Sequence, residues 1–140
     1  MSDSPVSPTP SAPADAAAED NTPAIISYLF GIGLIIAAVM HSSNKTQVGA
    51  YHLRQALGIL LLAIGGTIVF VVLGIVCAFL GGIPFVGWFL LHGLGLLAWV
   101  FRIGLLVLTV LGLLAASKRE LTPLPVIGGP CQKFFGSLFG

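Results

Sequence analysis

Three long apolar stretches follow one another along the chain, separated by short polar or turn-forming segments. They cover residues 24–40, 53–80 and 85–116, and the breaks between them contain HSSNKTQVGA and GGIP. Apolar runs of about 17–25 residues are typical of transmembrane helices. As a helix, the third run would be roughly 48 Å long, which exceeds a hydrocarbon core of about 30 Å. The pattern predicts an all-α integral membrane helical bundle with three transmembrane helices, or four if the third run breaks near Arg102.

Composition supports the membrane interpretation. Hydrophobic residues make up 56% of the chain and charged residues only 8%, whereas soluble domains carry about 25% charged residues. Between Lys45 and Lys118 the only charged residues are Arg54 and Arg102. The net charge of +1 comes without a cluster of basic residues, so a nucleic-acid partner is not expected. The expected surrounding is a lipid bilayer.

The distribution of Lys and Arg favours three spans over four. With three spans, the loop at 41–52 and the C-terminal tail share one side, which then holds Lys45, Lys118, Arg119 and Lys133. The opposite side receives the N-terminal tail and GGIP, which contain no Lys or Arg. Basic residues are enriched in cytoplasmic loops. The predicted topology is therefore N-terminus outside, with the 41–52 loop and the C-terminus in the cytoplasm.

The two ends of the chain differ from the predicted transmembrane domain at 23–117. Residues 1–22 form an acidic segment rich in Pro, Ala and Ser, and its composition is typical of a disordered tail. Residues 118–140 form a cytoplasmic tail with a short amphipathic segment. Its apolar positions recur at helical spacing: Cys131, Phe134, Phe135, Leu138 and Phe139. This face is expected to lie on the membrane surface, with packing against the bundle or a partner as the alternative.

A group of polar side chains opens the second apolar run. Tyr51, His52, Arg54 and Gln55 occur within the motif AYHLRQALG. Arg54 can anchor the helix at the headgroups, while Gln55 enters hydrocarbon and is expected to bond to a neighbouring helix. A ligand contact is the alternative for this group. Arg102 is expected to extend to the outer headgroups, the alternative being a polar interior that binds an anion.

The residues that most enzymes and coupled carriers use are missing from the apolar segments. Every Asp precedes residue 21, and the two glutamates are Glu19 and Glu120. No carboxylate therefore lies at membrane depth, where ion-coupled carriers usually need one. The histidines and cysteines show no metal-binding spacing. The sequence predicts a protein that is not an enzyme, with no cofactor and no metal site.

The segment NKTQVGAYHLRQALG resembles a signature of a family of small bacterial membrane proteins of uncharacterised function. This family is distantly similar to a protein-import component of the chloroplast inner envelope. A second, C-terminal likeness lies in PLPVIGGPCQKFFGSLF. The matching positions are Asn44, Lys45, Tyr51, His52, Arg54, Gln55 and Ala56, followed by Pro125, Ile127 and Gly128.

The resemblance implies a helical bundle in the bacterial inner (plasma) membrane, without implying a reaction. The chloroplast relative has four helices, whereas this chain is predicted to have three. The expected function is a non-enzymatic structural, assembly or protein-translocation-associated role. A small oligomeric channel or carrier is the alternative. The expected partners are lipid and either a second copy of the chain or another membrane protein.

Overall fold

The computed structural model describes residues 20–83 and 85–138, and within them every regular element is a helix. The prediction of an all-α chain is confirmed for this part. The helices are α2 (Thr22–Ile26), α3 (Phe30–Ser43), α4 (Gln47–Leu80), α5 (Val86–Ser117) and α6 (Gly128–Phe134). The segment 1–19, where most of the disordered tail was predicted, lies outside the described residues.

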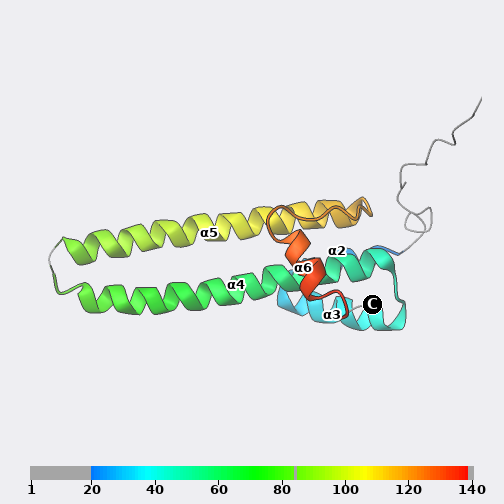
Figure 1. Cartoon of the computed structure of the whole chain (residues 1–140), viewed down its shortest axis with the longest axis horizontal. Helices are drawn as coiled ribbons and strands as arrows, with labels where there is room; N and C mark the ends of the chain where they lie inside the picture. Colours follow the sequence, from blue (N-terminus) through cyan, green and yellow to red (C-terminus); the bar gives the residue numbers. More distant parts are fainter. Residues whose placement is uncertain (1–19, 84, 139–140) are drawn as a thin grey trace, which may run out of the picture.

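Helices α4 and α5 form a long antiparallel hairpin, and α2, α3 and α6 gather at one of its ends (Figure 1). The hairpin turns at the predicted GGIP break. Phe85 has a φ of 67° there, and a side chain at Gly87 would collide with the backbone of Gly81. The two helices are long and apolar enough to cross a membrane. These are the only helices of that length among the described residues, so three spans are not confirmed.

The first apolar run does not form the single helix predicted over 24–40. It is divided into α2 and α3 by a turn at residues 27–29. The amides of Tyr28 and Leu29 donate to the carbonyls of Ile25 and Ile26, at 3.2 and 2.9 Å. This tightening of the turn directs the Tyr28 ring into the bundle, where it is 5% exposed. Helix α3 is about 21 Å long, too short for a hydrocarbon core of about 30 Å.

The structure divides into a packed end and two exposed arms. The packed end comprises α2, α3, α6 and the 118–127 loop around residues 47–60 of α4 and 105–117 of α5. It holds the whole apolar core of the described chain, including Ala24, Ala37, Val48, Leu53, Ala56, Ala116 and Leu124. The arms are residues 61–80 and 86–104, which remain almost entirely exposed. Burial therefore stops abruptly where the short helices end.

Helices α4 and α5 differ in how closely they match the predicted bounds. Helix α4 begins at Gln47, six residues before the predicted start at 53, because the Thr46 hydroxyl caps it by accepting from the Gly49 amide at 3.0 Å. Helix α5 matches its predicted bounds within one residue and continues unbroken through Arg102. The break near Arg102 that four spans would require is therefore absent from α5.

The C-terminal segment packs on the bundle. Residues 128–134 form α6, and Cys131 is buried against Gly58 of α4, where an added side chain would collide with its sulfur. Phe134 is 83% exposed, so the predicted single apolar face is divided between two directions. Cys131 thus packs against the bundle, as the alternative expected, while the contact of the exposed positions Phe134 and Leu138 with the membrane surface stays a prediction. Phe139 lies outside the described residues.

Candidate functional site

A buried polar cluster lies at the centre of the packed end. Its members are His52 and Gln55 of α4, both 0% exposed, and Tyr28 of the α2–α3 turn. The Tyr28 hydroxyl is 3.1 Å from His52 Nδ1 and 3.1 Å from Gln55 Oε1. The rings of Tyr28 and His52 meet edge to face, with centroids 5.9 Å apart. Gln55 was expected to bond to a neighbouring helix; Tyr28, its partner here, lies instead in the turn between α2 and α3.

Two backbone carbonyls complete the cluster. His52 Nε2 is 2.9 Å from the carbonyl oxygen of Glu120, and Gln55 Nε2 donates to the carbonyl oxygen of Thr122 at 3.3 Å. Both carbonyls belong to the loop after α5. The cluster therefore joins α4 to the N-terminal turn and to the C-terminal loop.

The donors in this cluster can be assigned from chemistry. A carbonyl oxygen only accepts, so His52 must carry a proton on Nε2. Burial lowers the pKa of His52 and so favours the neutral ring, which then accepts at Nδ1. The amide of Gln55 is oriented by Thr122, which leaves Oε1 facing Tyr28. Tyr28 has one hydroxyl proton and two acceptors within reach. We infer that the single proton of Tyr28 is shared between His52 and Gln55.

The end of α5 is shaped to bring its loop to this cluster. Arg119 has a φ of 57°, and the amides of Arg119 and Glu120 donate to the carbonyls of Ala116 and Ala115. This pair of bonds is the usual way in which a left-handed residue ends a helix. Asn21 Nδ2 also donates to the carbonyls of Ala116 and Ser117, at 3.2 Å each. The start of α2 is therefore attached to the end of α5.

Of the other predicted site residues only Tyr51 borders the cluster, with its ring edge to face with that of His52 and centroids 5.5 Å apart. The backbone carbonyl of Tyr51 accepts from Gln132 Nε2 at 3.0 Å, and Arg54 Nη1 donates to Gln132 Oε1 at 3.4 Å. These two positions hold α6 on α4. Asn44 and Lys45 are exposed in the loop between α3 and α4. Residues of the motif therefore take part in the buried cluster, in the contact between α4 and α6, and in the exposed loop between α3 and α4.

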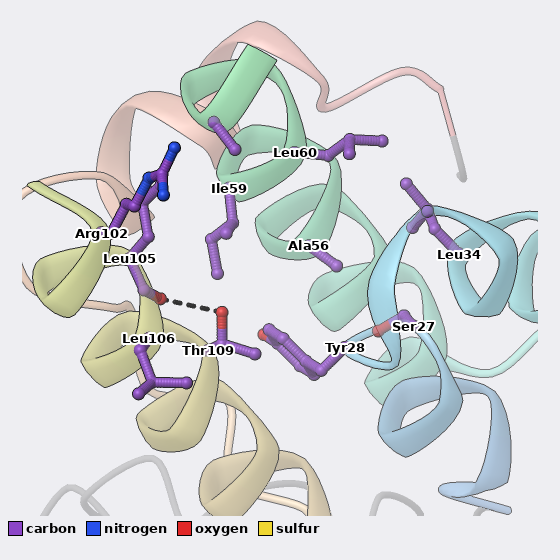
Figure 2. Close-up of a pocket in the computed structure, with 12 residues that line it drawn as sticks. Ser27, Tyr28, Leu34, Ala56, Ile59, Leu60, Arg102, Leu105, Leu106 and Thr109 are labelled. Atoms are coloured by element: carbon purple, nitrogen blue, oxygen red, sulfur yellow. Dashed lines mark hydrogen bonds between the residues drawn. The ribbon is translucent and has the colours of Figure 1, made fainter. Parts of the chain in front are cut away.

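Arg102 lies apart from the motif, in the wall of a cavity of about 280 Å³ (Figure 2). The wall is contributed by the α2–α3 region, α4 and α5, with Ser27, Tyr28, Gly31, Leu34, Ala56, Ile59, Leu60, Ala63, Leu105, Leu106 and Thr109 as the other lining residues. Tyr28 extends from its turn toward Thr109. The Thr109 hydroxyl donates to the Leu105 carbonyl at 2.8 Å. The cavity is therefore mainly apolar, with Arg102 as its one charged lining residue.

Tyr28 is the member of the cluster that the sequence analysis did not single out. A signal was present, since AIISYLFGIG contains a phenol within an apolar run. A buried phenol usually finds a hydrogen-bond partner. Its partners could not be identified, however, because a continuous helix over 24–40 would not return the ring to α4 in this way.

Within the described residues no three His, Cys, Asp or Glu side chains lie close enough to hold a metal ion. Comparisons of the chain with known protein families, with curated proteins and with solved structures find no match.

Proposed function

We propose that this chain is an integral membrane protein whose α4–α5 hairpin crosses the bilayer twice. The observation that carries the proposal is the match between the exposed arms and a membrane. Residues 61–80 correspond to about 30 Å of helix, close to the thickness of a hydrocarbon core. The most apolar windows of α4 and α5 are only 6% and 0% buried. Core helices of a soluble protein would be covered, so lipid is the covering that these arms require.

The first apolar run is proposed to enter the membrane boundary and return to the same side. Asn21 bonds to the end of α5, and Tyr28 contacts His52 in the buried polar cluster. Helix α3 then runs back toward the start of α4. Its residue His41 lies so close to Gly49, in the first turn of α4, that a side chain at Gly49 would collide with it. In this arrangement both ends of the first run share the side of the packed end. Two spans replace the three expected from the sequence.

The packed end is proposed to face the cytoplasm of a bacterial inner membrane. The basic residues outside the arms are at that end: Lys45, Arg54, Lys118, Arg119 and Lys133. The turn at 81–85 has none, and cytoplasmic segments are enriched in Lys and Arg. The likeness to a bacterial membrane family supports the choice of membrane.

The proposed role is structural or in assembly, without catalysis, and is associated with protein translocation as the resemblance implies. The buried polar groups support this role, because His52 and Gln55 are occupied in joining segments of the chain. The arms present apolar faces that suit contact with other membrane helices. Gly74 has open space beside it and Ala78 is exposed one turn later, a spacing that allows close helix packing.

Photo-crosslinking in native membranes, combined with a flux assay, tests this role. A photoreactive residue at Gly74 and another at Gly65, which faces the opposite side of α4, report what contacts each face. We expect discrete adducts with another membrane protein from one face and lipid adducts from the other. Purified protein in liposomes should give no ion or solute flux above empty liposomes. Self-adducts together with flux would instead support an oligomeric channel.

A further inference from the structure

We propose that the face of the arms around Arg102 is a docking site for a transmembrane helix of another protein that carries an Asp or Glu at the same depth. The carboxylate would pair with the Arg102 guanidinium, and the rest of the helix would pack along the arms. This inference rests on the proposed membrane location of the arms and adds the chemistry of the partner to the proposed assembly role.

Arg102 is a single charge on an apolar face. It is exposed, and it is the only Asp, Glu, Lys or Arg of α5. No hydrogen bond or ion pair joins it to another residue within the described ranges 20–83 and 85–138. Its guanidinium points away from the cavity and toward the arms (Figure 2). Side chains of an α-helix lean toward its N-terminus, which for α5 is the hairpin turn.

The depth of Arg102 separates its charge from the headgroups of both leaflets. Arg102 follows Val86 by about 24 Å of helix, farther than an Arg side chain extends toward the hairpin turn. The arm ends at residue 104, about 3 Å beyond Arg102 in the direction of the packed end. A guanidinium that points back toward the turn therefore lies inside the proposed hydrocarbon core, where a charge is costly unless it is paired.

The counter-ion must be present at that depth. Phospholipid phosphates lie at the headgroups, and a free anion in hydrocarbon would lose its hydration. A carboxylate on a transmembrane helix can lie at the level of the guanidinium and accept two parallel N–H bonds from it. A second copy of this chain cannot supply that carboxylate, because every Asp and Glu of the sequence precedes residue 21 or is Glu120. The partner is therefore a different protein.

The surface beside Arg102 has room for a helix. A hollow of about 150 Å³ lies between α4 and α5 and is lined by Thr67, Phe70, Val71, Ala98, Phe101 and Arg102. Its α4 residues share one helix face with Gly74 and Ala78. On α5, Gly95 lies about two turns before Arg102, and a side chain added there would meet open space. Small residues on both arms allow the close approach that a short carboxylate side chain needs.

The test measures the binding of a defined helix to the full-length protein. A fluorescence donor is attached through Gly82→Cys, with both native cysteines replaced by alanine, and the protein is reconstituted in phosphatidylcholine liposomes. The probes are acceptor-labelled transmembrane peptides of leucine and alanine with one Glu, or Gln in its place, at the level of Arg102 or nearer to either end. By energy transfer we expect the Glu peptide to bind about tenfold more tightly than the Gln peptide, as one charge-assisted bond provides, and only with Glu at the level of Arg102.

The variants change the charge and the approach separately, so that one remains informative if another does not fold. Arg102→Gln should abolish the preference for Glu, and Arg102→Glu should instead prefer a peptide with Arg at that level. Lys118→Gln removes an exposed charge at the end of α5 and should leave the preference unchanged. Gly95→Leu should weaken binding by blocking close approach. Gly93→Leu lies on the other side of α5, also in open space, and should behave as the parent protein.

Each result supports or overturns the docking site. Equal binding of the Glu and Gln peptides, or a preference that persists in folded Arg102→Gln protein, would overturn it. Strongest binding with Glu at the cytoplasmic end of the peptide would also overturn it, because Arg102 would then extend to the headgroups. Association of two labelled copies in place of peptide binding would assign the face to a second copy. A protein that stays soluble without detergent and does not insert would refute the proposed membrane function itself, whereas insertion without a preference for Glu refutes only the docking site.

Discussion

Removing the Tyr28 hydroxyl should have a larger effect than the loss of one hydrogen bond usually has. In Tyr28→Phe the ring is retained, but His52 Nδ1 and Gln55 Oε1 both lose the one side-chain donor that reaches them from the described residues 20–83 and 85–138. Both residues are completely buried, so water cannot replace the hydroxyl without a rearrangement of the packed end.

The expected cost follows from this arrangement. A buried polar group left without a partner costs about 1–3 kcal/mol. Since one proton serves two acceptors, the loss is counted once, and we expect the free energy of unfolding to fall by about 2 kcal/mol. That change is roughly 30-fold in the ratio of folded to unfolded protein.

Unfolding in mixed detergent micelles, followed by helical circular dichroism, measures this effect. Thr67→Val is the matched control, because its exposed hydroxyl only donates to the Ala63 carbonyl of its own helix. We expect the control to stay within about 0.5 kcal/mol of the parent. A Tyr28→Phe protein as stable as the control would refute the proposed sharing of the proton.

Three further predictions concern the contacts around this cluster. Gln55→Leu should lower the unfolding free energy by about 0.6–2 kcal/mol in the same assay, and its effect should not add to that of Tyr28→Phe; full additivity would show that the two side chains are uncoupled. Gly112→Ala should lower the unfolding free energy, because the new methyl group would collide with the Tyr28 ring. Gly104→Ala on the same helix meets open space and should raise the unfolding free energy by up to about 1 kcal/mol. Equal effects of the two variants would contradict the packing of Tyr28 against Gly112. Burial raises the pKa of the Cys131 thiol, so less of it is thiolate at pH 7 and it should react slowly with a maleimide. The reaction should be faster in Gly58→Ala, because the added methyl group displaces α6. An unchanged rate would mean that α6 is not held at Gly58.

Much of the fold could be predicted from the sequence, because long apolar runs report helices directly. The bounds of α5 agree with the prediction within one residue, and GGIP marks the hairpin turn. The break in the first run could not be predicted in the same way. Hydropathy does not distinguish a continuous helix from two short ones when the turn residues are as apolar as their neighbours.

The candidate site was predicted in part. Gln55 stood out because an amide at the start of an apolar run requires a partner, and the structure supplies Tyr28 and Thr122. The partners themselves could not be predicted. One lies on the unexpected α2–α3 turn, and the other is a backbone carbonyl, whose position depends on how α5 ends at Arg119 rather than on any side chain.

The sidedness of the chain tests the central proposal, a two-span hairpin with both ends of the first run on one side. Single cysteines are introduced by Asp20→Cys, Ser43→Cys or Gly82→Cys, with both native cysteines replaced by alanine. In intact cells an impermeant thiol reagent should label only the protein with Gly82→Cys, and the other two only after permeabilisation. Labelling of the Asp20→Cys protein in intact cells, alongside Gly82→Cys, would contradict the two-span arrangement and restore three spans.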